Sequence, residues 1–293
     1  MSKNSKVLLV TGICLMCLST VMSLFNYKAL FGPFFEMPSD YELIEMKIDA
    51  QDIHTIHVDT DNERVIIKPT DDDYVTINYY ESNLKTYKLT NKDGKISLEE
   101  NNKRIIFNFN FNLWNDAEIV VEVPKYLILE YKIYTDNSKI EISDLNIGNS
   151  LFETSNASVI VSNINSDNKM DIKTSNGKVD ISDSNINSII VKTSNGGINI
   201  QDVKTTNINL RTSNGRISFD KLESPNIEMK TSNARVEGTI VGDEEDYYKD
   251  IKTSNSYIEI DGREYGKKIL DKNNNNNEIV IKTSNGRVSI DFE

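Results

Sequence analysis

Alternating apolar and polar residues follow most of the chain after about residue 40, and they recur around one tetrapeptide. Thr-Ser-Asn-(Gly/Ala/Ser) begins at Thr154, Thr174, Thr193, Thr212, Thr231, Thr253 and Thr283, with spacings of 20, 19, 19, 19, 22 and 30 residues. Apolar residues stand two places before each Thr and five places after it, and most copies have another seven places after, which is the period of a β-strand. The change from even to odd offsets indicates a corner at the tetrapeptide, where Asn and Gly tolerate a left-handed backbone.

A repeat of about 19 residues is too short for a β-α unit and suits one rung of a parallel β-solenoid. One rung cannot offset its own ordering entropy, so the rungs must stack. The sequence therefore predicts an all-β fold, with a right-handed coil favoured by the crossover rule. The regular solenoid is expected over residues 125–293, with insertions at 242–250 and 262–278.

Weaker copies extend the pattern toward the N-terminus. Thr135-Asp136-Asn137 lies 19 residues before Thr154, and Thr60-Asp61-Asn62 is flanked by alternating aliphatic residues. Asn91-Lys92-Asp93-Gly94 has the composition of a hairpin turn. Residues 41–124 are therefore predicted to form either irregular rungs of the same body or a separate β-cap.

The N-terminal segment has a different pattern. Val7–Phe25 contains no charged residue, and Lys3 and Lys6 precede it. This length suits one transmembrane helix, and the bases place the tail in the cytoplasm. We predict a cytoplasmic tail (1–6), a transmembrane anchor (7–26), a juxtamembrane linker (27–40) and an extracytoplasmic remainder. A cleaved signal peptide is the alternative, although its apolar region is usually shorter.

Composition narrows the possible functions. The net charge of −12 argues against a non-specific nucleic-acid binder. Two Cys, both within the predicted anchor, and two His leave little for a disulfide framework, a metal site or thiol chemistry. We therefore predict no metal and no cofactor.

Basic residues gather on both sides of the repeated corner. They are Lys173, Lys192, Arg211, Lys230, Lys252 and Lys282, each just before a Thr, and Lys178, Arg216, Arg235 and Arg287, each four places after one. One interpretation is a solvated face that prevents edge association. The other is a stripe that binds anionic polymers of the Gram-positive wall, such as teichoic acids. The Asn of each corner is expected to stack in an amide ladder, a structural role.

The hypothesis that the protein is an enzyme rests on few residues. Asp183 and Asp202 occupy equivalent places on adjacent rungs, with Asp180 nearby, and paired outward carboxylates are used by polysaccharide-cleaving β-helices. No His lies beyond His57 to support this site. We therefore predict a protein that is not an enzyme and has no catalytic residue.

The repeated Lys-Thr-Ser-Asn-Gly-x-(Val/Ile)-x-Ile, the lead-in Ile119-Val120-Val121-Glu122-Val123-Pro124 and the N-terminal anchor resemble a bacterial family of β-strand-repeat proteins labelled putative adhesin. That family includes LiaG-like members from envelope-stress operons of Gram-positive bacteria. The resemblance covers residues 40–293 and implies a membrane-associated surface protein whose biochemical role is unassigned.

The sequence favours a membrane-anchored extracytoplasmic scaffold or adhesin-like binding surface of the cell envelope. Its expected partners are the lipid bilayer, through the N-terminal helix, and an anionic cell-wall polymer or a membrane protein. Two alternatives stay open. One is an accessory or sensor partner in envelope-stress signalling, and the other is a polysaccharide-active β-helix enzyme.

Overall fold

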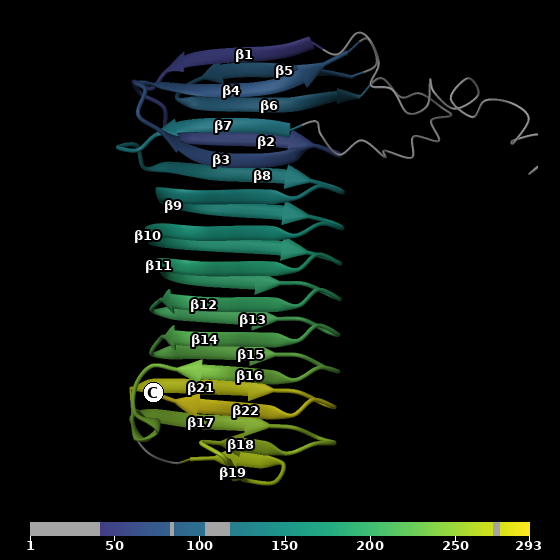
Figure 1. Cartoon of the computed structure of the whole chain (residues 1–293), viewed down its shortest axis with the longest axis vertical. Coiled ribbons are helices and arrows are strands. Elements are labelled where there is room, and N and C mark those ends of the chain that lie inside the picture. The colour runs from purple at the N-terminus through teal and green to yellow at the C-terminus, as the bar shows by residue number, and fades with distance from the viewer. Residues whose placement is uncertain (1–41, 83–84, 103–117, 272–275) are drawn as a thin grey trace, which may run out of the picture. The chain divides into compact units, whose positions relative to one another are not determined.

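A computed structural model describes residues 42–82, 85–102, 118–271 and 276–293 (Figure 1). Over these ranges the chain forms β-strands and one 3-10 turn, Glu244–Asp246. None of the described residues belongs to a helix long and apolar enough to cross a membrane. The predicted tail (1–6), anchor (7–26) and linker (27–40) lie outside the described residues.

Two facing layers of strands make up each coil, and we name them sheet A and sheet B. Sheet A contains, in spatial order, β1 (Glu42–Asp49), β4 (Tyr74–Glu81), β7 (Glu118–Pro124), β3 (Arg64–Thr70), the first parts of β9 (Ile140–Thr154), β10 (Val159–Thr174) and β11 (Val179–Lys192), then β12 (Ile198–Lys204), β14 (Ile217–Glu223), β16 (Val236–Ile240), β22 (Val288–Phe292), β18 (Ile258–Ile260) and β19 (Arg263–Glu264). Sheet B contains β5 (Lys85–Lys92), β6 (Lys95–Asn102), β2 (Thr55–Thr60), β8 (Leu129–Thr135), the second parts of β9–β11, then β13 (Asn207–Arg211), β15 (Asn226–Lys230), β21 (Asn277–Lys282), β17 (Tyr247–Lys252) and β20 (Lys268–Leu270). The all-β, solenoid-like repeat predicted from the sequence is confirmed.

The core lies between the two sheets. In the rung around Thr193, Val191 points inward from sheet B, while Ile198 and Ile200 point inward from sheet A. All three are buried, and the equivalent residues of neighbouring rungs stack on them in register. The inward positions are therefore the ones that the offsets from Thr predicted.

The repeated corner is held by two columns of side chains. Each Thr is buried, and in most copies its hydroxyl bonds to the corner backbone of its own rung or of a neighbouring one: Thr212 Oγ1 accepts from Gly215 N at 3.0 Å and donates to Gly196 O, on the preceding rung, at 3.1 Å. The Asn side chains form one continuous amide ladder, with Nδ2 to Oδ1 distances of 2.6–2.9 Å. Its members, in spatial order, are Asn62, Asn137, Asn156, Asn176, Asn195, Asn214, Asn233, Asn285 and Asn255. The expected structural role of the Asn column is confirmed.

Close approach of successive corners explains the glycine that follows several of these Asn residues. A Cβ atom on Gly196 would lie 1.7 Å from Gly177 O, whereas the nearest atom to a Cβ on Gly197 is Arg216 O at 3.4 Å. Ala157 and Ala234 occupy the equivalent place in other rungs, so alanine is tolerated there. Substitution of Gly196 by the larger valine therefore tests the close approach better than alanine would.

We expect Gly196→Val to lower the free energy of unfolding by about 3 kcal/mol, because the added side chain forces two backbone segments apart. Gly197→Val is the matched control and should change it by less than about 1 kcal/mol, since Lys178 and Arg216 occupy the same place in neighbouring rungs. Thermal unfolding followed by circular dichroism compares the two variants. Equal losses would contradict the close approach.

The order of the rungs departs from the order of the sequence at the C-terminal end. The last repeat, β21–β22, lies between the β15–β16 rung and the β17–β18 rung. The yellow strands of Figure 1 accordingly sit above the green β17 and β18. Asn285 confirms the insertion, because it bonds to Asn233 on one side and to Asn255 on the other.

At the N-terminal end, too, the order of the rungs departs from the order of the sequence. The β2–β3 rung, first in the sequence, lies between the β6–β7 rung and the rung formed by β8 and the start of β9. Beyond β6 and β7, the antiparallel strands β1, β4 and β5 close the stack. The described residues of 41–124 therefore supply both rungs and cap strands, which the sequence had left as alternatives for this segment. The predicted hairpin at Asn91–Gly94 joins β5 to β6.

Part of each predicted insertion is structural. Residues 247–250, within the first insertion, begin strand β17. Residues 263–264 and 268–270, within the second, form β19 and β20, which pair antiparallel with β18 and β17. The C-terminal end of the stack is thus closed by antiparallel strands, as the N-terminal end is. This arrangement covers edges that would otherwise remain open to pairing.

Candidate polyanion-binding surface

Six of the ten predicted bases form one unbroken row on the outer face of sheet B, and we name it the basic row. Each lies beside the next across neighbouring strands, in the order Lys173, Lys192, Arg211, Lys230, Lys282 and Lys252. The residue before each one points into the core, so strand alternation turns these side chains to solvent. Insertion of the last repeat keeps the row continuous, because Lys282 fills the place between Lys230 and Lys252.

The structure adds a base that the repeat did not reveal. Lys268 on the antiparallel strand β20 is exposed and lies directly opposite Lys252. It belongs to no copy of the tetrapeptide, so only pairing of the cap strand could place it at the end of the basic row.

The other four predicted bases lie on the outer face of sheet A, where acids on the same face hold them. Lys178 Nζ is 2.6 Å from Asp180, and Arg216 and Arg235 each approach Glu237 at 3.3 Å. Arg287 contacts Glu237 at 3.8 Å and the Tyr257 hydroxyl at 3.3 Å. Because the two sheets face each other across the core, these four bases point away from the basic row. The ten bases thus form two separate surfaces, not one stripe.

The basic row is less fully neutralised. Among the described residues, Lys192 and Lys230 have no ion-pair partner, and both are exposed. Arg211 bonds Glu228 at 2.8 Å, and Lys173 contacts Glu153 at 3.5 Å. Positive side chains on adjacent strands repel one another, so a counter-charge placed along the row would stabilise it.

Asp250 sits between the last two repeat bases of the row. Lys252 and Lys282 approach its carboxylate at 2.7 and 3.4 Å. Burial acts in the opposite direction, but hydrogen bonds from these two lysines hold the pKa of Asp250 below its usual value. Asp250 is therefore ionised at neutral pH and neutralises part of this end of the row.

The charge changes sign toward the N-terminal rungs. The positions beside Lys173 in successive strands are Glu153, Tyr134, Asp59 and Glu99. His57 lies on the same face, with its ring 5.6 Å from that of Tyr134, and burial lowers its pKa. Acidic residues thus follow the basic row toward the N-terminal rungs, whereas Lys268 follows it at the other end.

A shallow groove of about 400 Å³ runs beside the basic row on the same face of sheet B. Two lines of side chains form it, one and two pleats farther from the corner than the bases. The nearer line contains Ile190, Asn209, Glu228 and Val280, and the farther line contains Ser188, Asn207, Asn226 and Glu278. The groove therefore offers aliphatic, amide, hydroxyl and carboxylate groups next to the bases.

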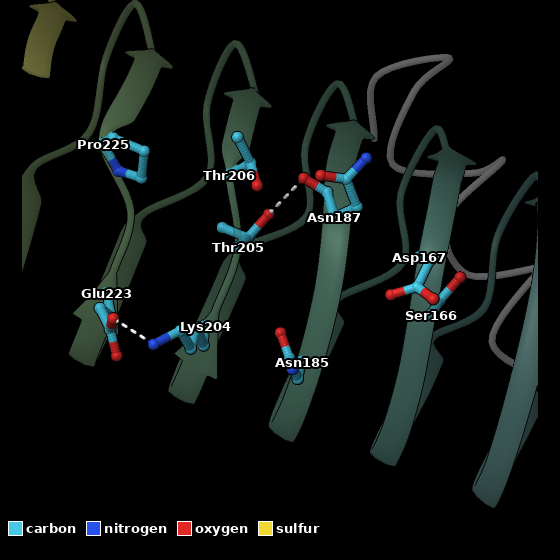
Figure 2. Close-up of a pocket in the computed structure, with 9 residues that line it drawn as sticks. All are labelled: Ser166, Asp167, Asn185, Asn187, Lys204, Thr205, Thr206, Glu223 and Pro225. Carbon is cyan, nitrogen blue, oxygen red and sulfur yellow. Dashed lines mark hydrogen bonds and ion pairs between the residues drawn. The ribbon is translucent and has the colours of Figure 1, made fainter. Parts of the chain in front are cut away.

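A second groove, of about 480 Å³, lies at the opposite edge of the rungs (Figure 2). Its only base, Lys204, is paired with Glu223 at 2.5 Å, and Thr205 Oγ1 donates to Asn187 O at 3.2 Å. Asp167, Asn185 and Thr206 complete a polar lining. With its lysine neutralised, this groove has no surplus of positive charge. None of its residues was predicted from the sequence as a site residue.

Asp183 and Asp202, the candidate carboxylate pair, have a conformational role in the structure. Both adopt left-handed backbone angles, with φ of 50°, at a bend in sheet A, and Asp144 and Asn163 do the same in earlier rungs. Asp and Asn are the non-glycine residues that tolerate this conformation best. Lys221 contacts Asp202 at 3.6 Å, and Asp180 is paired with Lys178. The left-handed backbone at the bend therefore gives a structural reason for Asp at positions 183 and 202.

Comparison with known proteins identifies the family. The model of the Toastrack DUF4097 family matches residues 53–291. The chain belongs to this family. Among curated proteins none matches the chain.

Solved structures similar to this Toastrack chain include a putative cell adhesion protein from Clostridium sporogenes (12% identity, TM-score 0.32, covering 86% of this chain and 100% of that one). A putative adhesin from Parabacteroides distasonis has 12% identity and a TM-score of 0.43, covering 86% and 97% of the two chains. A protein from the same organism, described as a putative lipid binding protein, has 14% identity and a TM-score of 0.33, covering 87% and 97%. The Toastrack match confirms the predicted membership of a family of β-strand-repeat proteins.

In the part of this Toastrack chain that the structure describes, no group of three or more His, Cys, Asp or Glu side chains converges in a way that could hold a metal ion.

Proposed function

We propose that this protein is a non-catalytic binding surface of the cell envelope, and that the basic row of sheet B binds an anionic cell-wall polymer such as teichoic acid. One observation carries the proposal: the six bases of the row lie side by side on six strands, Lys268 follows on a seventh, and Lys192 and Lys230 lack acidic partners among the described residues. Neighbouring bases recur at the strand spacing of about 4.8 Å, so a linear polyanion could meet several of them in succession.

The net charge of −12 opposes such binding at long range. Screening over about 8 Å at physiological salt lets the local row dominate at contact. Arg211 could bind two oxygens of one phosphate, whereas the lysines act as point charges. Affinity should therefore be modest and should fall as salt is added.

The proposal retains the membrane anchor at residues 7–26, an extracytoplasmic location for the repeat domain and the right-handed coil. Its support for the anchor is the uncharged run Val7–Phe25 with bases before it. An anchored repeat domain would place the basic row within reach of polymers attached to the wall or the membrane surface.

Two triple variants of the full-length chain test the proposal, because each removes three positive charges. Lys192→Gln/Arg211→Gln/Lys230→Gln alters the basic row, and Lys178→Gln/Arg216→Gln/Arg235→Gln alters sheet A. We expect the first to weaken binding of purified teichoic acid about tenfold at low salt, from three exposed contacts of about 0.5 kcal/mol each. The second should weaken it by less than about twofold, because all three of those bases are paired with acids, whereas in the first variant only Arg211 is.

Binding is measured by retention on immobilised polymer at low and high salt, with circular dichroism as the folding control. Equal weakening by the two variants would mean that net charge, and not the row, governs binding. Absence of retention of the wild-type chain at low salt would overturn the proposal.

A further inference from the structure

The groove beside the basic row has chemistry that a bare polyanion would not use. Glu278 is exposed in its farther line, and Glu228 lies in its nearer line. Carboxylates repel anions, but they accept hydrogen bonds from hydroxyl groups. A ligand that fits both the row and the groove must therefore carry anionic groups on one side and hydroxyl donors on the other.

The polar groups of the groove are partly free to bind such a ligand. Glu228 is held by Arg211 at 2.8 Å and by Asn209 at 2.5 Å, so its charge is balanced within the protein. Among the described residues, the side chains of Asn207 and Ser188 make no hydrogen bond to the protein, and Asn207 is exposed. An amide offers both donors and an acceptor, and a hydroxyl offers one of each. These are the groups that pair with sugar hydroxyls.

Two aliphatic side chains give the groove apolar contact surface. Ile190 on β11 and Val280 on β21 point outward from sheet B and are half-buried, at the two ends of the groove's nearer line. Each leaves an apolar patch beside amides and bases. The carbon–hydrogen face of a sugar ring can cover such a patch while its hydroxyls remain bonded.

We propose that the ligand of this surface is an acidic glycan, a polymer whose charged groups contact Lys192, Arg211 and Lys230 while its sugar hydroxyls bond within the groove. This inference rests on the proposed function and narrows its ligand class. A polymer of charge alone would engage the row and leave Asn207, Ser188 and Ile190 unused. The groove thus acts as the element that selects glycan over bare polyanion.

The test compares two linear polymers with the full-length chain: a polyuronate, which has carboxylates and hydroxyls on every sugar, and inorganic polyphosphate, which has charge but no sugar. The groove variant is Asn207→Ala/Ile190→Ser. We expect it to weaken polyuronate binding about tenfold, because it removes an amide and an apolar surface that a sugar would contact. Polyphosphate has no sugar, so its binding should weaken by less than about twofold. Lys192→Gln/Lys230→Gln should weaken both.

Asn146→Ala is the matched control, because Asn146 is an exposed amide on the outer face of sheet A. It should leave both affinities unchanged. If the groove variant binds polyuronate as the wild type does, the glycan inference is overturned while polyanion binding stands. If neither polymer binds the wild-type chain at low salt, the proposed function fails together with the inference.

Discussion

Val191→Asp is expected to unfold the middle of the stack. Val191 is completely buried, with Ile172 and Leu210 beside it on the neighbouring strands. A carboxylate there has no partner and no water, so we expect the free energy of unfolding to fall by about 4 kcal/mol or more. Each rung is stabilised by its two neighbours, so the damage reaches both adjacent interfaces. The midpoint of thermal or urea unfolding of the full-length chain measures the effect.

Lys192→Asp is the control, one residue along the same strand. Lys192 is exposed and lies between Lys173 and Arg211, so an acid there relieves repulsion and buries nothing. We expect the free energy of unfolding to change by less than about 1 kcal/mol. Comparable losses for the two variants would contradict the assignment of inward and outward positions.

That assignment could be predicted from the sequence because it depends on local geometry. Strand side chains alternate, and each Thr marks the same point of every rung, so a fixed offset decides whether a residue points inward. Val191 and Lys192 differ by one offset and therefore lie on opposite faces. The amide ladder was predictable for the same reason, since Asn195 of one rung must stack on Asn176 and Asn214 of its neighbours.

The order of the terminal rungs could not be predicted, because the copies are interchangeable. The Lys-Thr-Ser-Asn sequence at Lys282 could pair with that at Lys230 as well as the one at Lys252 could. The only sign of this order in the sequence is the spacing between successive tetrapeptides, which rises from 19 to 22 and then 30 residues. The extra residues before β17 and β21 let the chain pass one rung position and return to fill it.

The candidate site was predicted in part. The offsets identified all ten bases, but the separation of Arg216 from Arg211 depends on the two sheets facing each other across the core. Ion pairing then distinguishes the surfaces further, through acids such as Glu237 that no repeat position marks. The groove was not predicted, because outward positions such as Ile190 and Asn207 vary from rung to rung and carry no periodic signal.

Lys85→Met is expected to open the N-terminal end of the stack. Lys85 on β5 contacts Glu63 at the first corner and lies 3.2 Å from Glu100 on β6, and all three side chains are largely buried. Thr60 Oγ1 lies 2.5 and 3.0 Å from the same two carboxylates. Without the ammonium group two buried negative charges face each other, and breaking a buried pair in this way costs about 3–5 kcal/mol. Burial and Glu63 raise the pKa of nearby Tyr87, so its hydroxyl stays neutral and adds no third negative charge.

Hydrogen exchange of the amides in 85–102 measures this effect, because a repeat stack opens locally from its ends. We expect lost protection there and unchanged protection in β11–β14. Lys68→Met is the matched control, since Lys68 is exposed and contacts Glu122 at 3.1 Å, and a surface pair contributes less than about 1 kcal/mol. The triple variant Lys85→Met/Glu63→Gln/Glu100→Gln removes all three charges and should restore much of the protection, because neutral side chains of similar size need no counter-ion. Failure of that restoration would show that Lys85 stabilises the cap by packing, and not by balancing the two carboxylates.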